Sequence, residues 1–131
     1  MAQDFERNTA NGVGTSAVTL RTANSDDAIV GIMVANVTSS QITVEVYITV
    51  SSDDIHLIKD APIPAGSALQ VLDGGAKIVM QSGDVLKVKS NTASSADVWH
   101  LLYQMGQVLH SQKHHQVEQV ISLLFILVLQ M

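Results

Sequence analysis

The sequence predicts an all-β protein, a single antiparallel β-sandwich or jelly-roll-like domain, followed by an atypical apolar C-terminal tail with the composition of a short helix. Short segments rich in Val, Ile and Thr are separated at regular intervals by turn clusters of Gly, Asn, Asp and Ser. The stretch Ile42–Val50 alternates apolar and polar residues, which is the period of a half-buried strand. A chain of 131 residues fits one domain. Roughly seven or eight such strands are typical of a sandwich or jelly roll.

We expect three regions along the chain. Residues 1–16 contain Gly12 and Gly14 and are predicted to form a flexible N-terminal arm. Residues 17–104 are predicted to form the sandwich. Residues 105–131 are rich in His, Gln and Leu and form the atypical tail.

The first strands of the sandwich differ in how clearly they are marked. Residues 17–22 alternate weakly and suit an edge strand, whereas residues 28–37 are apolar on both faces and suit a central strand. Gly31 leaves room there for a bulge or a close neighbour. Residues 42–50 follow after a polar turn, so we expect them to form an antiparallel hairpin with residues 28–37. The apolar face of this third segment holds Ile42, Val44, Val46, Ile48 and Val50, and its other face holds Thr43, Glu45, Tyr47 and Thr49.

The remaining strands are short and are separated by turns. We expect them at residues 55–58, 68–72, 76–80, 85–90 and 96–103. Pro62 and Pro64 have no backbone N–H to donate, so the chain around them should lie at a sheet edge or corner.

Composition excludes some classes of function. The formal charge of −5 without a Lys/Arg cluster disfavours nucleic-acid binding, because such a surface repels phosphate. Cysteine is absent, so disulfides and thiolate sites are impossible. Asn36-Val37-Thr38 matches a glycosylation sequon, but we interpret it as a strand end followed by a turn.

The histidines of the tail are the one candidate metal cluster. On a helix, His110 and His114 would share a face at the spacing of zinc pairs, with His115 beside them. The Glu that follows the first His in metalloproteases is absent. We therefore predict no metal site and no cofactor.

Acidic pairs offer two further candidate sites. Asp26-Asp27 and Asp53-Asp54 could supply calcium ligands, but no EF-hand spacing is present, and acidic turn residues commonly cap and solvate turns. His56 lies beside the second pair, which could raise its pKa, yet no nucleophile accompanies it. We predict ordinary turn residues, an exposed His and no catalytic residues.

The tail admits two interpretations. The apolar run Val120–Leu129 is about half the ~20 residues of a membrane span, so we predict no span, and the run should seek cover on the sandwich or on another subunit. Alternatively, the tract from His100 onward is out of frame. His and Gln codons begin with CA, and a one-base shift converts them to Ser, Pro, Thr or Ala codons, the style of the preceding sequence. The nucleotide sequence decides between the two.

Residues 34–98 carry a set of recurring motifs. An N-x-T/S strand end is followed by the alternating Val/Ile/Thr strand, then by "HLIKDAPIPAGSAL", by a Gly-containing hairpin before "KIVM", and by "SGDVLKV" before a Ser/Asn/Thr loop. With these motifs the segment resembles small structural proteins of tailed bacteriophages, particularly of the cyanophage type. The resemblance implies an all-β virion component, assembled in the host cytoplasm, that contacts copies of itself or other virion proteins at the capsid surface, neck or tail.

We therefore predict a non-enzymatic virion structural or decoration subunit that acts as a homo-oligomer through assembly contacts. Amphipathic aromatics anchor interfaces and exposed loops carry contacts, so the expected interface residues are Tyr47, Asp53, Asp54, Asn91 and Trp99. For Trp99, a place in the sandwich core is the competing interpretation. The alternative function is a carbohydrate- or cell-surface-binding module in which Tyr47 and Trp99 stack on sugar rings.

Overall fold

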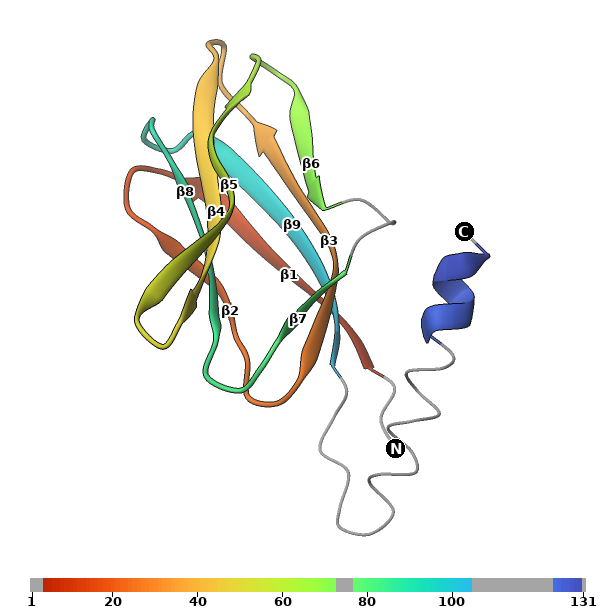
Figure 1. The fold of residues 1–131 in the computed structure, drawn as a ribbon. Coiled ribbons are helices and arrows are strands. Elements are labelled where there is room, and N and C mark those ends of the chain that lie inside the picture. Colours follow the sequence, from red (N-terminus) through yellow and green to blue (C-terminus); the bar gives the residue numbers. More distant parts are fainter. Residues whose placement is uncertain (1–3, 73–76, 105–123, 131) are drawn as a thin grey trace, which may run out of the picture.

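The structure, a computed structural model, describes residues 4–72, 77–104 and 124–130. These residues form two antiparallel sheets that face each other (Figure 1). Sheet A consists of β1 (Asp4–Val13), β9 (Ala96–Gln104), β3 (Asp27–Asn36) and β6 (Ala68–Leu72) in this order, and β7 (Ile78–Met80) also pairs with β3. Sheet B consists of β2 (Val18–Thr22), β8 (Val85–Ser90), β4 (Ile42–Val50) and β5 (Asp53–Ile63) in this order. Residues 124–129 form a short helix. The predicted all-β sandwich is confirmed.

The order of the strands is that of a jelly roll. When β7 is set aside, the first strand pairs with the last, the second with the second last, and so on: β1 with β9, β2 with β8, β3 with β6, and β4 with β5. Successive pairs alternate between sheets A and B, so one long hairpin is wrapped around the core, as in an eight-stranded jelly roll. β7 is added to this pattern. It pairs with Asp27–Ile29 of β3, on the same edge of β3 as β6, because β6 pairs only with the later residues of β3.

The core lies between the two sheets and is built by period-two alternation. In β8, Leu86, Val88 and Ser90 are buried while Val85, Lys87 and Lys89 are partly exposed. Ile29, Val34, Val46, Leu86, Val88, Met80 and Leu102 are fully buried. Each strand therefore contributes alternate side chains to one interior and leaves the others on an outer face.

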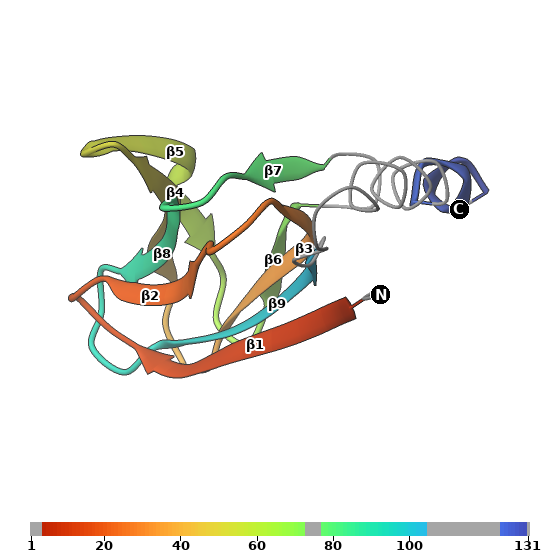
Figure 2. The ribbon, with the colours of Figure 1, turned by 90° about the horizontal axis from the view of Figure 1, so that it is seen from below.

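The predicted flexible arm over residues 1–16 is wrong for its described part. Residues 4–13 form β1, which pairs with β9 from Asp4 opposite Gln104 to Val13 opposite Ala96 (Figure 2). The strand was missed because two of its inward side chains, Glu6 and Asn8, are polar and so break the apolar alternation that marks a strand. Their partners lie far away in the sequence.

The predicted hairpin between residues 28–37 and 42–50 is also wrong. β3 lies in sheet A and β4 in sheet B, so the connection crosses from one sheet to the other. The side chain of Asn36 holds this crossing, because its Nδ2 donates to the carbonyl oxygens of Ser40 at 2.7 Å and Ile63 at 2.9 Å, while its Oδ1 accepts from the Thr38 backbone N–H at 2.8 Å. Asn36 therefore ends β3 and begins a turn, as the sequence predicted.

The β4–β5 hairpin is tighter than predicted. Only Ser51 and Ser52 form its turn, both at positive φ of 49° and 77°, which is the backbone signature of a type I′ turn. Asp53 and Asp54 consequently belong to β5, opposite Val50 and Thr49. β5 is the edge of sheet B, as the prolines predicted, and Pro62 lies within it.

Candidate functional site: the outer face of sheet A

The outer face of sheet A is lined by side chains from β1, β9 and β3 that lie in rows across the strands. Thr9, Trp99 and Met33 form one row, Arg7, Leu101 and Gly31 the next, and Phe5, Tyr103 and Ala28 the third. Several large apolar side chains of this face are exposed to solvent: Trp99 by 46%, Phe5 by 53%, Met33 by 37% and, from β7, Val79 by 58%. These exposed apolar side chains come from four strands, which makes the face a candidate interaction surface.

A shallow hollow of about 330 Å³ lies beside Trp99, towards the end of this face where β9 begins. It is lined by Thr9, Ala10, Asn11, Met33, Ala35, Asp97, Val98 and Trp99. The guanidinium carbon of Arg7 lies 5.1 Å from the centre of the Trp99 ring, within cation–π range. One face of the indole is thus held by Arg7, and the rest of the ring borders the hollow.

At one end of the same face, the chain covers itself. Phe5 meets Tyr103 edge-on, with 5.0 Å between ring centres. Tyr103 and Ala28 pack against Leu124 of the short helix, and all three are buried. The helix exposes Phe125, Ile126, Leu127 and Leu129. This confirms neither interpretation of the tail, since residues 105–123 lie outside the described part.

The outer face of sheet B has a different chemistry. Glu45 of β4 accepts from His56 at 3.1 Å and lies 3.7 Å from the Lys59 ammonium and 3.8 Å from that of Lys89. Partial burial acts to raise the pKa of Glu45, but the hydrogen bond to His56 and the charges of the two lysines outweigh it, and the pKa is lowered. This face is therefore charged, and Glu45 is compensated by the three bases around it.

The predicted interface residues do not come together. Trp99 lies on the outer face of sheet A, whereas Tyr47 lies in sheet B, is largely buried, and packs against His56 at 5.0 Å between ring centres. Asp53 and Asp54 follow the β4–β5 turn at one end of the sandwich. Asn91 lies at the other end of β4, where its Oδ1 accepts from the Thr43 backbone N–H at 3.1 Å.

Burial and neighbours also decide the remaining predictions about these residues. Exposure of Trp99 rules out its competing place in the core. Burial raises the pKa of Tyr47 above its usual value, and the charges of Asp54 and Glu45 add to this effect. Because Tyr47 and Trp99 belong to opposite sheets, they cannot stack on one sugar ring.

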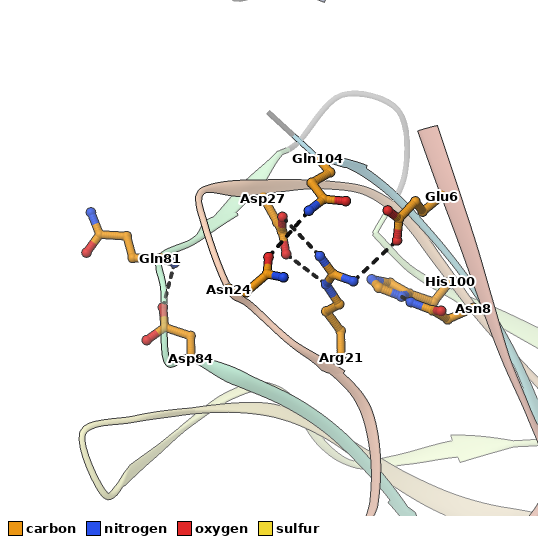
Figure 3. Close-up of polar contacts among 9 residues, drawn as sticks. All are labelled: Glu6, Asn8, Arg21, Asn24, Asp27, Gln81, Asp84, His100 and Gln104. Carbon is orange, nitrogen blue, oxygen red and sulfur yellow. Dashed lines mark hydrogen bonds and ion pairs between the residues drawn. The ribbon is translucent and has the colours of Figure 1, made fainter. Parts of the chain in front are cut away.

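A polar cluster that the sequence did not suggest lies between the sheets (Figure 3). The Arg21 guanidinium of β2 donates to both oxygens of Asp27, at 2.9 and 3.4 Å, and to Glu6 at 3.3 Å. Asp27 is fully buried and was predicted as a turn residue and, less favourably, as a calcium ligand. The bidentate Arg21–Asp27 pair instead joins β2 of sheet B to β3 of sheet A. The contact of Arg21 with Glu6 extends this connection to β1.

His100 completes this cluster and is fully buried on β9. Its Nδ1 lies 3.5 Å from Nδ2 of Asn8, and its Nε2 has no hydrogen-bond partner among the described residues. Burial lowers the pKa of His100 to about 4, and the positive charge of Arg21 contributes. The sequence does hold one signal for it, because Val98, His100 and Leu102 share a face of the strand and both neighbours are core residues.

Metal ligands are not gathered in the described part of the chain. Over residues 4–72, 77–104 and 124–130, no group of three or more His, Asp or Glu side chains is placed to hold an ion. His110, His114 and His115 lie outside the described residues, so their prediction is not tested. No helix in the described ranges is long and apolar enough to cross a membrane.

Comparison with known proteins yields similarity in fold. Neither a protein-family model nor a curated protein matches the sequence. A capsid chain of Helicobacter pylori bacteriophage KHP30 is similar over 82% of this chain and 94% of that chain, with 11% identity and a TM-score of 0.52. At this identity the match shows the fold alone, and it agrees with the jelly-roll order of the strands.

Two further similarities are weaker. A pentameric capsid protein from metagenomic phage sequences has 13% identity and a TM-score of 0.45, over 77% of this chain and 60% of that chain. The chain therefore spans 60% of the length of that capsid protein. A disulfide-linked pilus protein of Bacillus endospore appendages has 12% identity and a TM-score of 0.44, over 79% of this chain and 87% of that chain.

Proposed function

We propose that this chain is a structural subunit of a tailed-phage virion, in a decoration, neck or tail position, and that it acts through protein–protein contacts without catalysing a reaction. The observation that carries the proposal is the contrast between the two outer faces. Sheet A presents Phe5, Met33, Val79 and Trp99 to solvent, while sheet B presents a charged network around Glu45. Contacts through sheet A would remove this apolar area from water, which is the main driving force of association.

Fold and sequence support the proposal from separate directions. The jelly roll is a fold of viral capsid proteins, although lectins and cupins also use it. The KHP30 capsid chain has the same fold over nearly its whole length. The sequence motifs of residues 34–98 resemble phage structural proteins independently of that comparison.

The experiment is to detect the protein in purified virions by mass spectrometry and to compare the incorporation of two variants. Trp99→Asp places a charge on the proposed contact face and is expected to reduce incorporation about tenfold or more, because a carboxylate would be buried unpaired. Lys87→Asp makes a comparable change on the outer face of sheet B and is expected to incorporate normally. Absence of the wild-type protein from purified particles, or equal incorporation of both variants, would refute the proposal.

A second candidate function is carbohydrate binding, and the position of Trp99 beside the hollow favours it. An exposed indole next to polar groups such as Asp97, Asn11 and Thr9 can stack on a sugar ring while the polar groups bind hydroxyls. Titration with saccharides of the host surface, followed by Trp99 fluorescence, tests this candidate. Saturable quenching in the wild type, together with saccharide binding that calorimetry detects in the wild type and not in Trp99→Ala, would favour it over assembly.

A further inference from the structure

Trp99, which borders the hollow on sheet A, lies between the rows of two opposite charges. Arg7 lies in the row on one side of Trp99, opposite Leu101, and Asp97 lies two residues from Trp99 on the other side, opposite Ala35. At the rise of a β-strand, the two charged rows are each about 7 Å from the Trp99 row. Asp97 uses one carboxylate oxygen to accept from the Gly12 backbone N–H at 2.9 Å, so its other oxygen is available.

This arrangement is complementary to itself. Suppose that two copies of the chain face each other through sheet A. Consider a two-fold axis that lies in the plane between them, runs perpendicular to the strands and passes over Trp99. Rotation about this axis lays sheet A of one copy on sheet A of another with the strand directions reversed. The Arg7 row of each copy then faces the Asp97 row of the other, and the two Trp99 rings meet near the axis. In such an isologous contact, residue i meets residue j and j meets i.

We propose that a second copy of this chain docks on the outer face of sheet A in this two-fold manner, with Trp99 at the centre and two Arg7–Asp97 pairs around it. The inference rests on the proposed function, since it names the partner of the same face. Charge complementarity favours a second copy: of the side chains in these three rows, Arg7 is the one cation and Asp97 the one anion, and their rows lie at equal distances from that of Trp99. The third row is already occupied by Tyr103 and the short helix, so the dimer would use the rows of Arg7, Trp99 and Asp97.

The area of the face indicates a weak dimer. At a strand spacing of about 4.8 Å and a rise of about 3.3 Å per residue, three strands over the roughly six residues of these rows cover on the order of 300 Å² of flat area. Side-chain relief raises the accessible area, but it stays below the roughly 800 Å² per partner of a standard interface. A dissociation constant in the micromolar range is therefore expected, and copies held side by side on a particle would bind more tightly through repetition.

Charge reversal gives a sharp test by sedimentation equilibrium of the full chain. Arg7→Asp places carboxylates opposite carboxylates in its own dimer, and Asp97→Arg places guanidinium groups opposite each other. Each variant alone is expected to dimerise at least about tenfold more weakly than wild type. When the two variants are mixed in equal amounts, both charged contacts of the heterodimer again join a carboxylate to a guanidinium group. One contact joins the two substituted side chains, and the other joins the unchanged Asp97 of one copy to the unchanged Arg7 of the other. The affinity of the mixture is therefore expected to return to within about threefold of wild type.

Two further variants keep the test decisive. Lys87→Asp on sheet B is the control for net charge and should leave the affinity unchanged. Trp99→Asp should weaken the dimer at least about tenfold even if Asp97→Arg fails to fold. Wild type that remains monomeric at about 0.5 mM, a dimer insensitive to Trp99→Asp, or a mixture that does not recover would overturn the inference. Detection in virions together with a monomer in solution would leave the proposed function standing and would assign the face to another virion protein.

Discussion

Substitution of His100 by Asn tests how the protein tolerates an ionisable group in its core. Asn keeps a polar group near the position of Nδ1, within reach of Asn8, and removes both the titration and the unpartnered Nε2. At pH 7 the variant is expected to be less stable than wild type, because a smaller side chain leaves a cavity. The informative quantity is how this difference in the free energy of unfolding changes with pH.

The direction in which stability changes with pH follows from whether the folded or the unfolded chain binds the proton more readily. The pKa of His100 is lowered from 6.5 to about 4 in the folded state, chiefly by burial. Between these values the unfolded chain binds the proton and the folded chain does not, so the contribution to stability is complete above about pH 6.5 and is lost as the pH falls towards 4. At about 1.36 kcal/mol per pKa unit, the loss is about 3 kcal/mol. Wild type should lose this amount between pH 7 and pH 4, and His100→Asn should not.

The assay is urea unfolding of both proteins at several values between pH 7 and pH 4, followed by circular dichroism. The carboxylates titrate in both proteins, so the difference between the two free energies isolates His100. The stability gap between wild type and variant should narrow by about 3 kcal/mol, or reverse, as the pH falls. A gap that stays constant over this range would show that His100 is accessible to protons in the folded state, and the argument from burial would fail.

Three further substitutions probe other parts of the fold, each by urea unfolding at pH 7. Asp27→Asn leaves the Arg21 guanidinium with less charge compensation at a mostly buried site and should cost about 3 kcal/mol; a loss below about 1 kcal/mol would mean that water already solvates the pair. Leu102→Ala removes most of a fully buried side chain of β9 and should cost about 2–5 kcal/mol, and a smaller loss would indicate that the two sheets close over the space. Asn36→Ala removes the hydrogen bonds that hold the crossing between sheets and should cost about 2 kcal/mol. Lys59→Ala on the solvated face is the common control and should change stability by less than about 0.5 kcal/mol, so a larger change there would contradict the low value given to surface ion pairs.

Local patterns in the sequence were enough to locate most strands. Residues 42–50, 68–72 and 85–90 were predicted with the bounds that the structure has. The burial of Leu86 and Val88 and the partial exposure of Lys87 and Lys89 also follow from alternation alone. This works because a strand with one buried face imposes its period on neighbouring residues, so the information lies within a few positions.

β1 and the polar cluster show where this reasoning stops. Glu6 and Asn8 point inward, yet they lack the apolar character by which an inward position is recognised. They are stable there because Arg21 and His100, which come from other strands, supply charge and polar contact. The burial of a polar group is favourable or unfavourable according to its partner. The residues that neighbour such a group in the sequence do not reveal which distant residue will be that partner.

The amino-acid sequence by itself determined the fold class, the position of most strands and the protected β5 edge. Only the tertiary structure decided that β3 and β4 belong to different sheets, that β1 closes sheet A beside β9, and that Arg7, Trp99 and Asp97 lie together on one apolar face. The physical reason is the range of the interactions. Alternation is set between adjacent residues, whereas strand pairing and the surfaces it creates depend on contacts between segments that are up to a hundred residues apart in the chain.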